Sequence, residues 1–309
     1  MQNREMNGVL VIDKPSGRTS HDIVDIIRKA TGMKKVGHTG TLDPLATGVL
    51  VLLLGRATRI GRFLELEPKE YIAGAVFGIA TDTQDITGTI IEKSNTPVTK
   101  DALKRLMPEF TGEISQIPPM VSAIKIGGKP LYKLARQGKE IERPERKVTI
   151  FELVLLDYSI TDGKAHAVFR VLCSGGTYVR TLIHDMGARL GAGATLESLR
   201  RTRVGVYTVS QALTVDEANR EAIEARLISM DGALAHLPQV IVQNGLIGLL
   251  LNGQKIDAKG IKAHPDAIVS DEFVRVKSEN GVLLALGKVT NEATFEVKPE
   301  IVVGSGGQG

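Results

Sequence analysis

The chain has 309 residues, of which 42% are apolar and 24% are charged, and its formal net charge at pH 7 is +4. This length favours two domains, because a single hydrophobic core stops growing beyond roughly 250 to 300 residues. The sequence excludes a membrane-spanning helix, which needs about 20 consecutive apolar residues, and its first residues lack the apolar core of a signal peptide. The single cysteine, Cys173, excludes an intrachain disulfide, and we expect a cytoplasmic protein.

The positive charge is unevenly distributed along the chain. Residues 237–309 carry seven Lys and Arg against eight Asp and Glu, whereas the first 236 residues carry 32 against 27. The stretch 123–147 has eight basic and three acidic side chains. It indicates a polyanionic partner, because phosphates attract Lys and Arg regardless of sequence. A solvated basic face is the commoner explanation of any one such cluster.

The first predicted elements are a strand and a helix. Residues 8–13 are apolar and predict a buried strand, which ends in a turn at 14–17. Thr19 is typical of a helix N-cap, and apolar residues recur at helical spacing over 23–30. Gly32 is typical of the residue that ends a helix.

A glycine-rich loop, Gly-His-Thr-Gly-Thr-Leu-Asp-Pro-Leu-Ala-Thr-Gly, occupies residues 37–48 and precedes an apolar run over 49–54 that predicts a buried strand. Its glycines allow backbone conformations that other residues avoid. Pro44 restricts Asp43 to an extended backbone, because the proline ring clashes with a helical preceding residue. The loop therefore presents one carboxylate beside a buried strand. Taken alone, an aspartate in an ordinary turn is the commoner explanation.

Residues 56–64 predict a short helix that carries Arg56, Arg59 and Arg62 along one side. A solvated helix face and a contact with backbone phosphates explain this spacing about equally well. Residues 69–78 alternate as in a strand. They include a tyrosine that, judged alone, would be a half-buried packing residue.

The middle of the chain alternates between predicted helices and strands. Residues 99–110 predict an amphipathic helix, and residues 121–126 predict a strand. Residues 147–158 and 164–173 predict two long paired strands, joined by a Thr-Asp-Gly hairpin turn. Residues 214–227 predict a further helix.

Several motifs together resemble the TruB family of pseudouridine synthases. The loop at 37–48 is similar to the family's signature at all twelve positions. The other motifs are Lys-Pro-Ser-Gly at 14–17, Lys-x-Tyr at 69–71 followed by Thr-x-Thr-x-Asp at 81–85, Gly-Thr-Tyr-Val-Arg at 176–180, and a Leu-Arg-Arg-Thr run at 199–202.

The resemblance implies an α+β fold with two domains. Residues 1–236 would form a pseudouridine synthase catalytic domain, whose mixed, mainly antiparallel central sheet is flanked by helices. Within it, residues 124–147 would be an insertion loop that grips RNA and is loosely ordered without it. Residues 237–303 are similar to a small PUA-like β-barrel, and residues 304–309 would be a flexible tail.

The resemblance also assigns roles to individual residues. Asp43 would be the catalytic carboxylate, Arg180 its ion-pair partner, and Tyr71 the ring that stacks on the target base. Tyr178 would neighbour the flipped nucleotide, and Leu199 would form a wall of the uracil pocket. The two arginines that follow Leu199 would face RNA or carboxylates.

Further residues would bind the substrate. The resemblance places Lys14 beside the active-site loop, and His38 in the space that the flipped base leaves in the RNA stack. The basic side chains of the insertion complete the set of expected RNA contacts: Lys125, Lys129, Lys133 and Arg136.

The implied activity is the conversion of uridine to pseudouridine at position 55, in the T loop of tRNA. This reaction breaks the C1′–N1 bond, rotates the uracil and joins C5 to C1′, so no cofactor is expected. The positive charge that develops on the ribose requires a carboxylate, as in glycoside hydrolysis, and the base must first leave its stack. Asp43 is the candidate carboxylate, and attack on C1′, addition to the base and removal of the 2′ hydrogen all remain open as its role. The six histidines show no metal-ligand spacing, so no metal is expected.

Two alternatives to this enzyme remain at the level of sequence. The first is a tRNA-binding chaperone that remodels the tRNA elbow. The second is the archaeal and eukaryotic relative that uses a guide RNA, although the complete insertion at 124–147 favours the stand-alone bacterial form. For the enzyme, we expect tRNA as the partner, no membrane, no obligate protein partner and a monomer.

Overall fold

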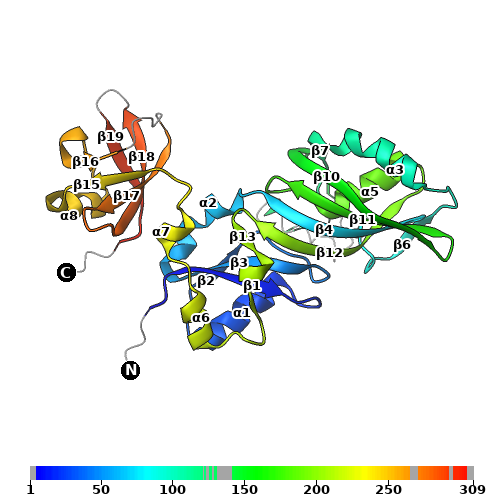
Figure 1. Cartoon of the computed structure of the whole chain (residues 1–309), viewed down its shortest axis with the longest axis horizontal. Coiled ribbons are helices and arrows are strands. Elements are labelled where there is room, and N and C mark those ends of the chain that lie inside the picture. The colour runs from blue at the N-terminus through cyan, green and yellow to red at the C-terminus, as the bar shows by residue number, and fades with distance from the viewer. Residues whose placement is uncertain are drawn as a thin grey trace.

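The computed structural model describes residues 5–120, 122, 125–126, 129–130, 141–264, 271–291 and 295–304, apart from the side chains of 125–126, 129–130 and 291. The described strands form one large sheet, a smaller C-terminal sheet and two short two-stranded pairs. The C-terminal sheet lies at one end of an elongated molecule, and the large sheet and its helices make up the remainder (Figure 1).

Ten strands make up the described part of the large sheet, in the order β14-β1-β3-β12-β4-β11-β10-β7, with β2 paired to β3 and β13 to β12. In the described part of this sheet, only β1 with β14 and β3 with β12 pair in parallel. The expected α+β fold with a mixed, mainly antiparallel sheet is therefore confirmed. These strands are β1 (Gly8–Lys14), β2 (Val36–Thr39), β3 (Thr47–Leu54), β4 (Lys69–Phe77), β7 (Gly112–Gln116), β10 (Arg146–Thr161), β11 (Lys164–Cys173), β12 (Ala194–Val204), β13 (Tyr207–Thr208) and β14 (Leu213–Thr214).

The large sheet consists of two halves that meet between β3 and β12. These two strands are joined at only two residue pairs, Thr47 with Arg200 and Gly48 with Arg201. We call this point the sheet junction. The glycine-rich loop connects β2 to β3, so it lies directly beside the junction.

Helices cover the sheet and bury its apolar side chains. Ile23 and Ile27 of α1 and Leu182 and Met186 of α5 belong to one continuous core with the sheet. The described helices are α1 (Ser20–Thr31), α2 (Gly61–Glu65), α3 (Lys100–Leu106), α5 (Val179–Arg189), α6 (Arg220–Arg226), α7 (Met230–Ala233) and α8 (Ile247–Leu251). Short 3₁₀ segments span Gly55–Ile60, Met107–Phe110, Val209–Gln211, Asn244–Leu246 and Ala258–Gly260.

The predicted boundaries of the first helix are confirmed. The Thr19 hydroxyl accepts a hydrogen bond from the Asp22 backbone N–H, and the Asp22 carboxylate accepts one from the Thr19 backbone N–H. This reciprocal pair satisfies two free donors at the helix start. Gly32 ends the helix with a φ of 72°, in the left-handed region that favours glycine.

Three predicted helices are shorter than expected. The segment predicted at 56–64 begins as a 3₁₀ turn over Gly55–Ile60 before α2. The segment predicted at 99–110 leaves the α conformation after Leu106, where Pro108 cannot donate a backbone hydrogen bond. The third, predicted at 214–227, forms a helix only after Asn219, whose side chain accepts from the Ala222 N–H.

The predicted strand at 121–126 is described only at its end. Lys125–Ile126 forms β8, which pairs with β9 (Lys129–Pro130). Another two-stranded pair consists of β5 (Ile79–Thr81) and β6 (Ile90–Lys93). Most of the expected insertion loop lies outside the described residues, and with it the prediction about its order without RNA.

The C-terminal sheet has the order β16-β15-β17-β18-β19 among the described residues. Its strands are β15 (Gln239–Val242), β16 (Ile261–Ala263), β17 (Phe273–Ser278), β18 (Leu283–Asn291) and β19 (Glu296–Val302). In this part of the chain no ladder joins the outer strands β16 and β19. The sheet is therefore open as described, and the expected PUA-like barrel is not confirmed.

The arginine row at 56–62 faces the C-terminal sheet. Arg56 donates to the Val303 carbonyl at 3.3 Å, and Arg59 donates to the Val302 carbonyl at 2.8 Å. The Arg62 guanidinium lies 5.0 Å from the centre of the Phe273 ring. The row thus contacts the C-terminal sheet and the residue that follows it, although Arg59 and Arg62 are exposed, and a contact with backbone phosphates stays a prediction.

Candidate active site

A cavity of about 370 Å³ opens beside the sheet junction. Both halves of the sheet contribute to it, because the glycine-rich loop belongs to the first half whereas β4, α5 and β12 belong to the second. Five of the residues predicted from the sequence line this cavity: Asp43, Tyr71, Tyr178, Arg180 and Leu199. Segments far apart in the chain therefore meet where the resemblance requires them to meet.

The loop that carries Asp43 is fixed to the first helix. The Ser20 hydroxyl donates to the Leu42 carbonyl at 3.0 Å and accepts from the Leu42 N–H at 2.8 Å. The backbone of Gly48 lies so close to Arg201 that a Cβ at this position would be 2.1 Å from the Arg201 carbonyl oxygen. Only glycine fits there, particularly at a φ of 100°.

Lys14 holds the same loop through hydrogen bonds to backbone carbonyls. Its side chain is fully buried, and its ammonium group donates to the carbonyls of Arg18 at 2.6 Å and Pro44 at 3.5 Å. Burial lowers the pKa of Lys14 to about 8, although the nearby Asp43 carboxylate opposes this shift. Lys14 thus supports the loop through backbone carbonyls, and its predicted contact with the substrate stays a prediction.

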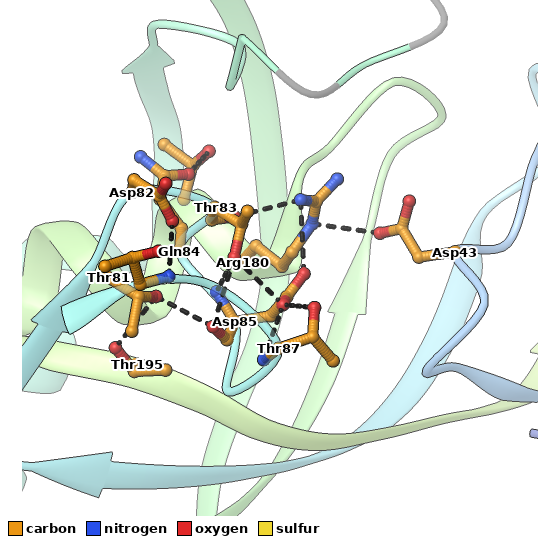
Figure 2. Close-up of polar contacts among 11 residues, drawn as sticks. Asp43, Thr81, Asp82, Thr83, Gln84, Asp85, Thr87, Arg180 and Thr195 are labelled. Carbon is orange, nitrogen blue, oxygen red and sulfur yellow. Dashed lines mark hydrogen bonds and ion pairs between the residues drawn. The ribbon is translucent and has the colours of Figure 1, made fainter. Parts of the chain in front are cut away.

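Asp43 and Arg180 form the central ion pair of the site. Arg180 Nε lies 2.9 Å from Asp43 Oδ2, and the arginine side chain is only 4% exposed, whereas the aspartate side chain is 36% exposed (Figure 2). The carboxylate is therefore accessible from the cavity while its partner is not. Burial raises the pKa of the Asp43 carboxyl, and the Arg180 guanidinium opposes this effect.

A second carboxylate, Asp85, holds the other side of the guanidinium. Arg180 Nη1 lies 3.3 Å from Asp85 Oδ2 and donates to the Thr83 carbonyl at 2.9 Å. The other oxygen of Asp85 accepts from the backbone and hydroxyl of Thr87 and from the Thr83 hydroxyl (Figure 2). The Thr-x-Thr-x-Asp motif at 81–85 predicted no role for its aspartate. Asp85 and its threonines fix the arginine that aims Asp43.

Tyr71 lies on β4 with its side chain turned into the cavity and is only 6% exposed. Burial raises the pKa of its hydroxyl, and the nearby Arg201 guanidinium opposes this shift. The hydroxyl of Tyr71 therefore stays protonated at neutral pH. Two residues earlier, Lys69 is also buried and donates to the carbonyls of Glu65 and Glu67. Burial lowers the pKa of Lys69 to about 8.

Tyr178 is fixed by a glutamine that none of the sequence motifs indicated. It is the N-cap residue of α5, two positions before Arg180. The Gln116 side chain accepts from the Tyr178 backbone N–H at 3.0 Å and donates to the Tyr178 carbonyl at 3.2 Å. Gln116 is 1% exposed, at the end of β7. The motif at 176–180 gave no signal for this partner, because a contact with the backbone leaves no trace in the sequence.

The remaining predicted residues lie around the cavity or beyond the described chain. Leu199 lines the cavity and is 8% exposed. His38 lies on β2, opposite Leu52, and is partly exposed outside the cavity lining. Burial lowers the pKa of the His38 imidazole. Lys125 and Lys129 are described only as backbone of β8 and β9, and Lys133 and Arg136 lie outside the described residues.

The described part of the chain contains no group of three or more His, Cys, Asp and Glu side chains that would hold a metal ion. None of its helices is both long and apolar enough to cross a membrane.

Comparisons with known proteins identify the family. Residues 28–179 match the model of the TruB family pseudouridylate synthase N-terminal domain, and residues 180–235 match that of the tRNA pseudouridylate synthase B C-terminal domain. The chain is 43% identical over 293 residues to tRNA pseudouridine synthase B of Pelotomaculum thermopropionicum, which covers 93% of this chain and 92% of that protein. The corresponding protein of Thermotoga maritima is 41% identical over 289 residues, and the match covers 94% of this chain and 92% of that protein.

Two solved structures agree with this result. A structure of an H/ACA ribonucleoprotein bound to a substrate RNA containing 2′-deoxyuridine matches with a TM-score of 0.72 at 27% identity, and covers 96% of this chain and 85% of that chain. A chain in the structure of a Cbf5-Nop10-Gar1 complex matches with a TM-score of 0.71 at 30% identity. The match covers 96% of this chain and 84% of that chain. The chain therefore belongs to the TruB family of pseudouridylate synthases.

Proposed function

We propose that this enzyme isomerises the uridine at position 55 in the T loop of tRNA, with Asp43 as the catalytic carboxylate. Isomerisation of uridine in tRNA follows from membership of the family. The observation that carries the catalytic role of Asp43 is the meeting of Asp43, Arg180, Tyr71 and Tyr178 in one cavity. The proposed position 55 rests on the resemblance of the sequence motifs. Its volume of about 370 Å³ lies in the range of roughly 300 to 1,000 Å³ that is usual for small-molecule sites.

The geometry suits the breaking of a glycosidic bond. As C1′–N1 breaks, positive charge develops on the ribose, and a carboxylate facing the cavity stabilises that charge. Arg180 contacts Asp43 through Nε and is itself buried, so it orients the carboxylate without competing for the substrate. The bond electrons leave with the uracil, which rotates and then bonds to C1′ through C5. The proton on C5 is then lost and N1 gains a proton, so the product is an isomer of uridine.

The target base needs a platform once it has left the RNA stack. Tyr71 and Tyr178 are the aromatic side chains among the residues that line the cavity, and Leu199 adds an apolar wall. We propose that Tyr71 stacks on the uracil and that Tyr178 and Leu199 complete the pocket. Because His38 lies on the loop side of the site but outside the cavity lining, it remains the candidate to fill the gap in the RNA stack.

The RNA-binding regions form part of the same proposal. We infer a catalytic domain over residues 1–236, an RNA-gripping insertion at 124–147 and a PUA-like RNA-binding domain over 237–303. The five-stranded sheet and its contacts with Arg56, Arg59 and Arg62 support a separate C-terminal domain docked beside the catalytic one. We further propose a cytoplasmic monomer that needs no protein partner and binds the T stem-loop of tRNA directly.

The test is incubation of the purified protein with an unmodified tRNA transcript, followed by mapping of pseudouridine at each uridine. The proposal predicts one pseudouridine, at position 55, without added metal or cofactor. A transcript with cytidine at position 55 is the matched control and should remain unmodified. Pseudouridine at other positions of the tRNA, with none at 55, would contradict the proposed site while leaving the family activity intact.

A further inference from the structure

Arg201 is a buried cation at the sheet junction, where the resemblance predicts an arginine that faces RNA or a carboxylate. Its side chain is 1% exposed, and it lines the same cavity as Asp43 and Tyr71. Within the described residues, no carboxylate forms an ion pair with it. Burial of an unpaired charge is unfavourable, so its retention at this position requires an explanation beyond packing.

The guanidinium contacts both ends of the loop that carries Asp43. Arg201 Nε donates to the Val49 carbonyl at 2.7 Å, and Nη2 donates to the Gly40 carbonyl at 3.1 Å. Val49 follows the loop and Gly40 precedes Asp43, so one side chain spans the segment that contains the carboxylate. The same loop also pairs with the Arg201 backbone through Gly48.

Arg201 belongs to the other half of the sheet from the loop it holds. It lies on β12, which also pairs with β4, and its partner across that ladder is Tyr71. The guanidinium is close enough to Tyr71 to lower the pKa of its hydroxyl against the larger effect of burial. Arg201 therefore contacts the segment that carries the carboxylate and neighbours the ring proposed to stack on the base.

Arg200 provides an internal comparison. Adjacent residues of a strand point to opposite faces of the sheet, and Arg200 pairs with the Asp13 carboxylate at 3.2 and 2.7 Å and with the Thr47 hydroxyl at 3.3 Å. It also joins the two halves of the sheet, but it contacts neither the loop at 40–46 nor the cavity. Arg200 thus shares with Arg201 the joining of the halves, but it contacts the loop only at Thr47 and not in the segment 40–46 that carries Asp43.

We propose that Arg201 is a positioning residue for the reaction: it holds both ends of the segment 40–49 against β12 and so fixes Asp43 relative to Tyr71 and Arg180. This inference rests on the proposed catalytic role of Asp43. Two hydrogen bonds from one rigid guanidinium define the placement of the loop better than a flexible ammonium group can. A displacement of a reacting group by about 1 Å costs about 100-fold in rate.

The experiment compares R201M and R201K with R200M, using full-length protein and an unmodified tRNA transcript. Single-turnover pseudouridine formation at saturating tRNA measures the chemical step, filter binding measures tRNA affinity, and amide hydrogen exchange at residues 40–49 reports the loop directly. We expect R201M to lower the single-turnover rate by about 100-fold, R201K to recover part of that loss, and R200M to stay within about threefold of the wild type. Exchange at 40–49 should rise in R201M, rise less in R201K and stay unchanged in R200M, and all three variants should bind tRNA normally.

Each other outcome overturns the proposal. An unchanged rate in R201M excludes a positioning role, and an equal loss in R200M assigns the effect to the sheet junction as a whole. Weaker tRNA binding at a normal rate makes Arg201 an RNA contact, and unfolding of both R201M and R201K makes it a purely structural residue. The D43N variant separates failure of the Arg201 proposal from failure of the proposed function. If D43N stays active, the proposed role of Asp43 is wrong, whatever the results for the Arg201 variants.

Discussion

Asp85 Oδ2 lies 3.3 Å from Nη1 of Arg180, on a guanidinium whose Nε contacts the proposed catalytic carboxylate (Figure 2). The arginine is therefore held between two carboxylates, of which one faces the cavity and the other is 5% exposed. Asp85 in turn accepts hydrogen bonds from neighbouring threonines. The orientation of Asp43 thus depends on residues that the substrate does not need to touch.

The first prediction concerns Asp85. D85N removes the charge that holds Arg180 while keeping the shape of the side chain, so the guanidinium should no longer aim Asp43. We expect the single-turnover rate to fall by about 100-fold, with tRNA affinity unchanged. D82N is the matched control, because Asp82 is exposed on the same segment and accepts only from the Thr89 N–H in the described chain. Equal rates for D85N and D82N would contradict the role of Asp85.

The pH dependence of the reaction should reveal the ionisation of Asp43. The reaction needs the carboxylate, so the rate should fall as pH falls through its pKa, which burial raises above the ordinary aspartate value. R180M removes the cation that opposes this shift, so the acid limb of the pH profile should move to higher pH. R189M is the control, because Arg189 lies on the same helix in an exposed ion pair with Glu109. An acid limb that R180M leaves in place would show that another group controls it.

Gln116 should stabilise the start of α5. Q116L leaves the buried backbone N–H of Tyr178 without its acceptor, which costs about 1 to 3 kcal/mol in the free energy of unfolding. Urea denaturation measures this loss, and S115A, at an exposed position of the same strand, should lose less than about 0.5 kcal/mol. Full stability of Q116L would mean that water or another group replaces the glutamine.

The contacts between the two sheets should affect tRNA binding rather than chemistry. R62A removes the guanidinium from the rings of Phe63 and Phe273. Two such contacts are worth about 1 kcal/mol together, which corresponds to about a fivefold change in an equilibrium constant. We expect KM for tRNA to rise by that factor with kcat unchanged, and R105A, exposed on α3, to change neither. An unchanged KM in R62A would argue against the proposed RNA-binding role of the C-terminal sheet.

Local signals in the sequence predicted several elements correctly. The run at 164–173 coincides with β11, and the turn before it has the positive φ values of Asp162 and Gly163 that such a hairpin requires. The Thr19 cap and the Gly32 end of α1 were also predictable, because both depend on side chains within a few residues. Helix lengths were less predictable, since α3 ends where Pro108 removes a backbone donor.

The site was only partly predictable. Asp43 and Arg180 are 137 positions apart, so no local pattern pairs them, and only the resemblance brought them together. Gln116 and Arg201 act through backbone carbonyls and N–H groups, which every residue has and which therefore leave no sequence signal. The same reason explains Arg59, whose partner is the Val302 carbonyl in a strand at the other end of the chain.

The most direct measurement is single-turnover pseudouridine formation by D43N at saturating tRNA, with tRNA affinity measured on the same preparation. The amide of asparagine keeps the shape of the side chain but cannot stabilise positive charge on the ribose. We predict that D43N forms no pseudouridine while it binds tRNA as tightly as the wild type. Pseudouridine formation by D43N at a rate comparable to that of the wild type would contradict the account.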